Sequence, residues 1–394
     1  MRWTFVAALL ACACDADRGA IDAASPADLA VGDTAAVVDL GACRAAVVAG
    51  APFGSPVVIS DPVNAAYAPT VAASGASALV AWHEFPPGGK KRVAYVVVAG
   101  GCVGPIVTLA DGAESSLPWA VATQAGFYLV YQGNAGGPDE IHGLALDAAG
   151  ASLGAPERLS AAGAYGTMAR AASVGDDVAI AWTDGARHWF ARRGPVEAVA
   201  ATMLPTTPVL TSQLQFPRVG IGAGGDLFFA WRDGPQSSDT DVFLARRPKL
   251  GALGAAVNVS STSGYLSDDV ALAVEPDGAI DVVWVEQDPV TVTAFEATWA
   301  RRSAAGALGS PAYFGAQDAM AWTPSVVAGL KTVWRGGSAG IGPLFYADGA
   351  TAPVPILAGQ KASGTALART ATGALRLAFS DDATPRRVLY AEGP

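Results

Sequence analysis

Residues 79–84 read Leu-Val-Ala-Trp-His-Glu, and this pattern decides the fold. It is a short apolar run that ends in an aromatic residue, with an acid two positions later. Such runs recur along the chain, and their seven aromatic residues are Trp82, Tyr131, Trp182, Trp231, Trp284, Trp334 and Phe379. The successive spacings are 49, 51, 49, 53, 50 and 45 residues, so the chain contains an internal repeat.

Each repeat has room for four short strands. A short apolar strand leads through a tight turn with Gly or Asp into a second strand, which ends in the aromatic residue. A polar loop, a third strand, another turn and a fourth strand follow. Four strands in a period of about fifty residues are typical of a propeller blade, whereas the rungs of a β-helix are shorter. The sequence therefore predicts an all-β chain, a seven-bladed β-propeller of four-stranded antiparallel blades.

The two ends of the chain are expected to complete one blade together. The last repeat runs through Val388-Leu389-Tyr390 and reaches Pro394 without a fourth strand, while residues 55–60, Ser-Pro-Val-Val-Ile-Ser, form a spare strand. Pairing these N- and C-terminal strands closes the ring and removes exposed edges. Residues 44–48 also resemble a third strand, so two candidates for the third strand of this blade remain open.

An acid follows the aromatic residue in five of the seven repeats. The positions two residues after the aromatic are Glu84, Gly133, Asp184, Asp233, Glu286, Gly336 and Asp381. A carboxylate at the end of a strand can accept hydrogen bonds from loop N–H groups, which is a structural explanation. The functional alternative is a ring of ligand-binding acids on one face, formed by Glu84, Asp184, Asp233, Glu286 and Asp381.

A third recurrent element is Ala-Arg-Arg, at residues 191–193, 245–247 and 300–302. Alternation along a strand places the two arginines of each pair on opposite faces. Ion pairs between blades would account for them, and anion binding is the alternative.

The N-terminus has the form of an export signal. Arg2 precedes a short apolar stretch at residues 5–10, too short for a spanning helix. Leu9-Leu10-Ala11-Cys12 resembles the bacterial lipobox, which implies lipid attachment at Cys12, with Cys14 as the alternative. We expect a signal at residues 1–14, a flexible tether at 15–34 and the propeller at 35–394. The protein would then be exported to the outer membrane or cell surface and touch the membrane only through its lipid.

Two further cysteines, Cys43 and Cys102, are expected to form a disulfide. An envelope compartment is oxidising, and the segments around the two residues are alike. Two separate buried thiols are the alternative.

The composition argues against several classes of partner and cofactor. The net charge is −10 without a basic stripe, so we expect no nucleic-acid partner. His83 and His188 lie in different repeats, and no metal site is predicted from them. Residues 237–241, Ser-Ser-Asp-Thr-Asp, could ligate Ca²⁺ through oxygens but lack the remaining features of a calcium loop. No cofactor is otherwise expected.

Over residues 55–394 the repeat resembles exported bacterial propellers of the sialidase-like superfamily in period and strand order. Enzymatic members carry Asp-boxes of the form Ser-x-Asp-x-Gly-x-x-x-Trp, and nothing here matches: residues 380–382, Ser-Asp-Asp, lack the Gly and Trp. The resemblance implies a degenerate glycoside hydrolase or lyase with its site at the central channel.

The residues themselves favour a different function, a binding module on the envelope. The loops between second and third strands, at residues 83–91, 132–139, 232–240 and 285–293, are long and variable. Variable loops on a rigid ring are the usual place for recognition. We therefore predict a monomeric binding module for a protein or glycan of the cell envelope, leave open whether it has catalytic activity, and keep the glycoside-acting enzyme as the alternative.

Overall fold

A computed structural model describes residues 41–109, 114–134, 137–195, 197–204, 215–236, 239–261, 265–287, 295–314, 321–337 and 341–394. Every element within these residues is a β-strand, which confirms the all-β prediction. Among them, no helix has the length and apolar character needed to cross a membrane. The predicted signal with Cys12 and Cys14, and the tether at 15–34, lie outside the described residues.

The strands form antiparallel meanders in chain order. The first sheet contains β3 (Ala65–Ser74), β4 (Ser77–Phe85), β5 (Arg92–Ala99) and β7 (Val107–Thr108), with β6 (Cys102–Val103) and β1 (Ala45–Ala46) added beside β5. The second contains β8 (Glu114–Thr123), β9 (Gly126–Asn134), β10 (Glu140–Asp147) and β11 (Glu157–Arg158). The third contains β12 (Thr167–Val174), β13 (Asp177–Thr183), β14 (His188–Arg193) and β15 (Val199–Met203).

An eight-stranded sheet contains two more meanders, joined by one parallel bridge between Thr240 and Leu266. Its strands are β16 (Gln215–Ile221), β17 (Leu227–Gln236), β18 (Asp239–Arg247), β19 (Val257–Asn258), β20 (Leu266–Val274), β21 (Ile280–Gln287), β22 (Phe295–Arg302) and β23 (Ala312–Tyr313). The next sheet contains β24 (Trp322–Val327), β25 (Lys331–Arg335), β26 (Leu344–Asp348) and β27 (Val354–Ile356).

The last sheet unites both ends of the chain. It contains β28 (Gly364–Arg369), β29 (Leu375–Ser380), β30 (Val388–Glu392) and, beside β30, the N-terminal strand β2 (Val57–Val58). Val57 pairs with Tyr390 and Val58 with Leu389. The other candidate, residues 44–48, does not join this sheet, because Ala45 pairs with Val103 in the first sheet.

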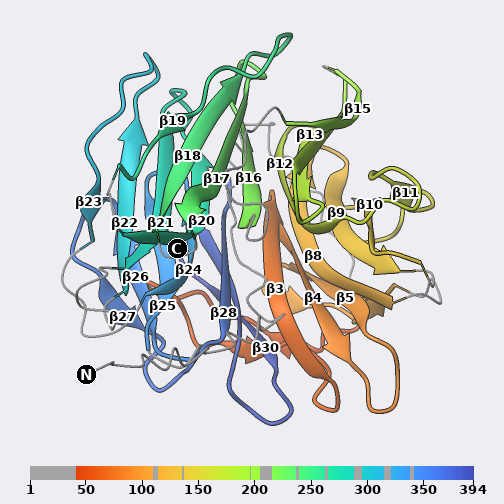
Figure 1. Ribbon diagram of the computed structural model, residues 1–394. Helices are drawn as coiled ribbons and strands as arrows, with labels where there is room; N and C mark the ends of the chain where they lie inside the picture. Colours follow the sequence, from red (N-terminus) through yellow and green to blue (C-terminus); the bar gives the residue numbers. More distant parts are fainter. Residues whose placement is uncertain are drawn as a thin grey trace, which may run out of the picture.

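The sheets follow one another around the molecule in chain order (Figure 1). The first strand of each meander packs against the first strand of the next, from β3 through β8, β12, β16, β20 and β24 to β28. β28 in turn packs against β3, so the last sheet lies beside the first.

The repeated aromatic residues form the core between neighbouring sheets. All seven are buried, and the most enclosed, Trp82, Trp284, Trp334 and Phe379, are 0% exposed. Trp334 of β25, for example, packs with Ala271 and Val283 of the preceding meander. Large flat side chains fill the wedge that opens between sheets radiating from one axis.

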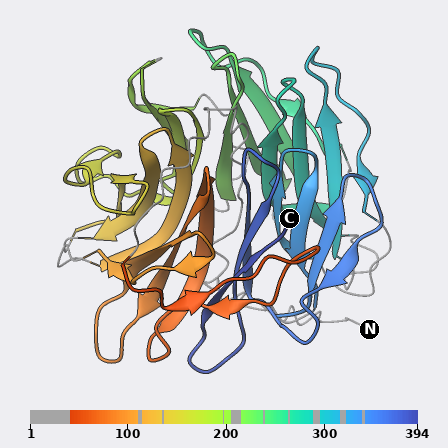
Figure 2. The same ribbon diagram turned by 180° about the vertical axis from the view of Figure 1, so that it is seen from behind.

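The predicted disulfide between Cys43 and Cys102 is present, with the two Cα atoms 5.5 Å apart. It fastens the N-terminal segment (residues 41–60) to the first sheet, where Arg44 N–H also donates to Val103 O (2.9 Å). The segment then crosses to the last sheet, where Gly54 N–H donates to Glu392 O (2.8 Å). Figure 2 shows this red-orange chain running from the orange strands across to the blue ones.

Reducing the disulfide should release the beginning of the N-terminal segment. Few backbone hydrogen bonds hold residues 41–50, whereas residues 57–60 are also paired with β30. We expect amide hydrogen exchange over 41–50 to accelerate in the Cys43→Ser variant, with little change in β29. Unchanged protection of 41–50 would show that the disulfide is not what fastens this segment.

Candidate functional site

One irregularity recurs in the first strands of the meanders. In six of them the register against the second strand shifts by a β-bulge near the start of the strand. Five described bulge residues have positive φ values, and these are Ala68, Leu117, Met168, Asp269 and Thr323. A bulge at equivalent positions re-aims one side chain per strand.

The bulge residues mark one end of the molecule. Leu117, Met168 and Asp269 are partly exposed although both of their sequence neighbours are buried. The second strands end at this same level, because Ala65 pairs with Phe85 at the end of β4. We name the bulge face the end formed by the five bulge residues, the ends of the second strands and the loops from second to third strands.

The sequence also contains an indication of these bulges, which is separate from the repeated aromatic residues. A proline follows the bulge position in four repeats, at Pro69, Pro118, Pro217 and Pro324. Proline inside a strand is confined to edges and bulges, because it lacks the N–H that a ladder requires.

Of the predicted ligand-face acids, Glu84 and Glu286 are buried at the ends of second strands. Glu84 accepts hydrogen bonds from Asn64 Nδ2 (2.9 Å), Trp82 Nε1 (3.3 Å) and Arg92 Nε (2.9 Å). Only 1% of Glu84 and 2% of Glu286 is exposed. The Glu84 carboxylate thus joins strand, loop and aromatic residue within its own sheet.

Asp184, Asp233 and Asp381 bind the loops that follow them. Asp184 accepts two loop N–H groups and the indole N–H of Trp189 (2.8 Å). Asp381 accepts two loop N–H groups and a hydrogen bond from Arg387 Nε (2.8 Å). Asp233 accepts the N–H of the next residue (2.8 Å). These three acids lie where second strands lead into the following loops, and their contacts within their own sheets favour the structural explanation.

A second set of charged residues, which the repeat pattern did not predict, connects three neighbouring meanders at the bulge face. Arg232 of β17 forms an ion pair with Asp268 of β20 (Nη1 to Oδ1, 2.8 Å), and both are buried. The neighbouring bulge residue Asp269 accepts a hydrogen bond from the N–H of Thr323 in β24 (3.1 Å). We name Arg218, Arg232, Asp268, Asp269 and Arg335 the Arg–Asp cluster.

The charged neighbours of Asp269 have opposite effects on the pKa of its carboxyl group. Burial and the adjacent Asp268 raise the pKa of the Asp269 carboxyl, and Arg335 and Arg218 act in the opposite direction. Arg218 is buried and donates through Nε to Val270 O, and Arg335 lies 5.8 Å from the ring centre of Trp322. In the sequence, only the adjacent acids Asp268 and Asp269 could have pointed to this cluster. No regular spacing relates them to their arginine partners.

Aromatic rings gather on the bulge face where the first and last sheets meet. The rings of Tyr67 and His83 are stacked with centres 5.7 Å apart, and Phe85 lies edge-on to both at 5.4 and 5.6 Å. Two cations lie over them: Arg386 is 4.7 Å from the Tyr67 centre and Lys91 Nζ 5.9 Å from the Phe85 centre. We name these five residues the Tyr67 cluster.

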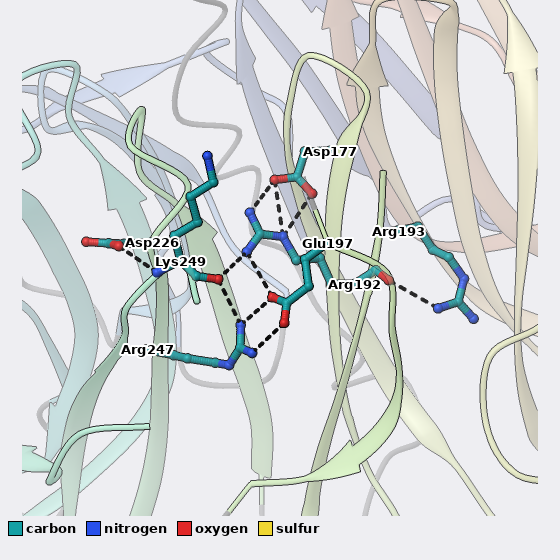
Figure 3. Close-up of polar contacts among 7 residues, drawn as sticks. All are labelled: Asp177, Arg192, Arg193, Glu197, Asp226, Arg247 and Lys249. Carbon is teal, nitrogen blue, oxygen red and sulfur yellow. Dashed lines mark hydrogen bonds and ion pairs between the residues drawn. The ribbon is translucent and has the colours of Figure 1, made fainter. Parts of the chain in front are cut away.

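The Ala-Arg-Arg elements form ion pairs at the opposite end. Arg192 is fully buried against Asp177 of its own sheet and lies 3.6 Å from Glu197 (Figure 3). Arg247 of the next sheet reaches the same Glu197 at 2.9 Å. Arg193 points to the preceding sheet, where it contacts Glu157 at 3.0 Å. Carboxylates thus accompany these arginines. Arg193 and Arg247 pair with acids of a neighbouring sheet, whereas Arg192 pairs mainly within its own.

The described residues contain no group of three or more His, Cys, Asp or Glu side chains that could hold a metal ion. Of the proposed calcium loop, Ser237 and Ser238 lie outside those residues. The Asp241 carboxylate accepts hydrogen bonds from Asn258 Nδ2 (2.7 Å) and Ser260 Oγ (2.7 Å).

No family model and no curated protein matches this sequence. Solved structures share its fold. An ulvan lyase from a new family of polysaccharide lyases is 8% identical with a TM-score of 0.54, over 88% of this chain and 94% of its own. A protein of unknown function from Dyadobacter fermentans DSM 18053 is 11% identical with a TM-score of 0.51, over 86% and 98%.

A puromycin-hydrolyzing peptidase from Mycobacterium tuberculosis is 15% identical with a TM-score of 0.54. The match covers 85% of this chain but only 52% of the peptidase. At such identities these similarities establish a fold shared with propeller proteins, and nothing about ligand or chemistry.

Proposed function

We propose that the chain forms a seven-bladed β-propeller that is closed by its own ends. Two observations support closure: the first strands contact one another in chain order with β28 against β3, and β2 completes the sheet of β30. Every sheet then has two neighbours, and the N-terminal segment links the first blade to the last.

We propose that this propeller is an exported, lipid-anchored binding module whose ligand lies on the bulge face. The main support is that the residue at the bulge position differs from one meander to the next. The five described bulge residues with positive φ are of five different types, Ala68, Leu117, Met168, Asp269 and Thr323, on an otherwise repeated scaffold. Recognition is expected where a rigid framework presents dissimilar side chains. The disulfide supports the exported location, since disulfides persist in oxidising compartments.

A glycan is the ligand class that we propose. Two structures of the ulvan lyase share the fold, and one of them is bound to -[GlcA(1-4)Rha3S]-. Partly exposed aromatic side chains on the bulge face would suit the apolar faces of sugar rings, because their surfaces are broad and rigid.

A glycan array probed with the full oxidised chain tests this function. The Leu117→Glu and Met168→Glu variants should lose about tenfold or more of the affinity for any ligand found, because each places a charge at the bulge face. Leu250→Glu is the matched control, since Leu250 is 74% exposed in the turn after β18, at the opposite end. If the affinity falls equally in the control, or does not fall in the two variants, the ligand does not bind at the bulge face.

The Arg–Asp cluster supports an enzyme as second candidate. A carboxyl with a raised pKa beside arginines is a typical general acid or base. If the chain cleaves acidic polysaccharides, reducing ends should accumulate with time and Asp269→Asn should abolish that accumulation. If the wild type cleaves the polysaccharide and Asp269→Asn does not, the protein is an enzyme and not only a binding module.

A further inference from the structure

The Tyr67 cluster is built from both ends of the described chain. Tyr67 belongs to β3, His83 and Phe85 to β4, and Lys91 to the loop after β4. Arg386 comes from the loop before β30, and its carbonyl oxygen accepts the N–H of Ala66 at 2.8 Å. This backbone contact across the junction of the last and first sheets anchors the loop that carries Arg386.

The Phe85 side of the Tyr67 cluster is accessible to solvent, whereas the His83 side is buried. Phe85 is 42% exposed, whereas His83 is only 3% exposed. Tyr67, Lys91 and Arg386 are partly exposed. Burial and the nearby Lys91 lower the pKa of His83 to about 3, so the imidazole is a neutral support under the cations. The surface combines an open aromatic side chain with two positioned positive charges.

The surrounding loops are basic although the protein is acidic. Residues 84–92 and 381–387 contain five basic and three acidic residues, in a chain of net charge −10. Two of these acids already have partners, because Glu84 pairs with Arg92 at 2.8 Å and Asp381 pairs with Arg387. Together the two segments carry two more positive than negative charges, so the local potential attracts anions.

We infer that the Tyr67 cluster is a subsite for an acidic sugar, a pyranose ring that carries a carboxylate or a sulfate ester; this rests on the proposed glycan-binding function. The C–H face of the sugar packs on Phe85, and the anionic group lies between Lys91 and Arg386. Both parts are needed. Aromatic surface alone suits neutral sugars, and cations alone suit any polyanion.

Binding of the full oxidised chain to four polymers tests the inference: a polyuronate, a sulfated dextran, neutral dextran and inorganic polyphosphate. Calorimetry at low and high salt should show binding to the polyuronate, the sulfated dextran or both, and the pattern identifies the anionic group. The affinity should fall as salt rises. Equal affinity for neutral dextran or for polyphosphate would overturn the inference, because either result removes one of its two requirements.

Variants locate the binding. In Lys91→Gln/Arg386→Gln the affinity should fall about tenfold or more and its salt dependence should flatten. In Phe85→Ala the affinity should fall about fivefold with the salt dependence retained. Lys249→Gln is the control, because Lys249 is exposed near the opposite end and its side chain points away from the ion pairs in Figure 3. The replaced side chains are partly exposed, and near-ultraviolet circular dichroism verifies that each variant is folded.

The two proposals fail in different ways. If the acidic polymer binds and Leu117→Glu abolishes binding while the Tyr67-cluster variants match the wild type, the bulge face binds glycans and the inferred subsite is wrong. If the array and all four polymers show no binding, the glycan-binding function fails and the subsite fails with it.

Discussion

Replacing Asp177 with alanine should lower the free energy of unfolding by about 3–5 kcal/mol, because it leaves the charge of Arg192 buried without its main partner. The Arg192 side chain is 0% exposed and that of Asp177 is 4% exposed. Asp177 accepts hydrogen bonds from Arg192 Nε at 2.9 and 3.2 Å (Figure 3). Glu197, 3.6 Å from Arg192 and shared with Arg247, compensates only in part. Urea denaturation followed by fluorescence measures the change.

Two further variants make this test specific. Asp348→Ala removes an ion pair with Lys331 in which the Asp348 side chain is 57% exposed, and it should cost less than about 1 kcal/mol. Asp177→Ala/Arg192→Met removes both buried charges and should be more stable than Asp177→Ala alone. If Asp177→Ala costs no more than Asp348→Ala, the pair is not a buried electrostatic contact.

Acidification should destabilise the protein through two buried histidines, by about 4 kcal/mol between about pH 8 and about pH 5. Burial lowers the pKa of His83 to about 3, and Lys91 adds to this effect. Burial lowers the pKa of His188 to about 4, against a smaller opposite effect of Asp184. The unfolded chain takes up both protons near pH 6.5, while the folded chain stays neutral. Stability is therefore lost as the pH falls below 6.5, by about 2 kcal/mol per histidine at about pH 5.

Carboxyl groups titrate as well, so the difference between two proteins is the informative quantity. Burial raises the pKa of Glu275 to about 7, which adds stability as the pH falls and opposes the histidines. The His83→Phe/His188→Phe variant keeps Glu275 and lacks the two histidines. From about pH 8 to about pH 5 its stability should rise by about 4 kcal/mol relative to the wild type. Parallel curves of stability against pH would show that neither histidine is held neutral by the fold.

The repeat could be predicted from the sequence because the residues that define it lie close together along the chain. Alternating apolar residues, Gly and Asp turns and a terminal aromatic residue act within about ten positions of one another, and each meander repeats them. The acid after the aromatic residue was also readable, since its partners lie in the same sheet: Glu84 binds Asn64, Trp82 and Arg92. A contact made within a single repeat can be predicted from the sequence of that repeat.

Contacts between neighbouring meanders could not be predicted from the sequence in this way. Arg232 contacts Asp268, and Asp269 contacts Thr323, between neighbouring meanders, and no regular spacing in the sequence predicts either contact. The Tyr67 cluster is more distant still, because Arg386 reaches Tyr67 only where the last sheet lies beside the first. The disulfide between Cys43 and Cys102 was predicted from likeness of the flanking segments, and the strand pairing of Ala45 with Val103 explains why they meet.

The sequence by itself therefore determined the all-β class, the period, the buried aromatic residues and the strands available for pairing, since local backbone preference and side-chain alternation settle them. The tertiary structure alone decided that residues 44–48 pair with the first sheet and which charges meet between neighbouring meanders. These depend on how neighbouring sheets approach around a common axis, and that geometry brings together residues that the chain keeps 36 to more than 300 positions apart.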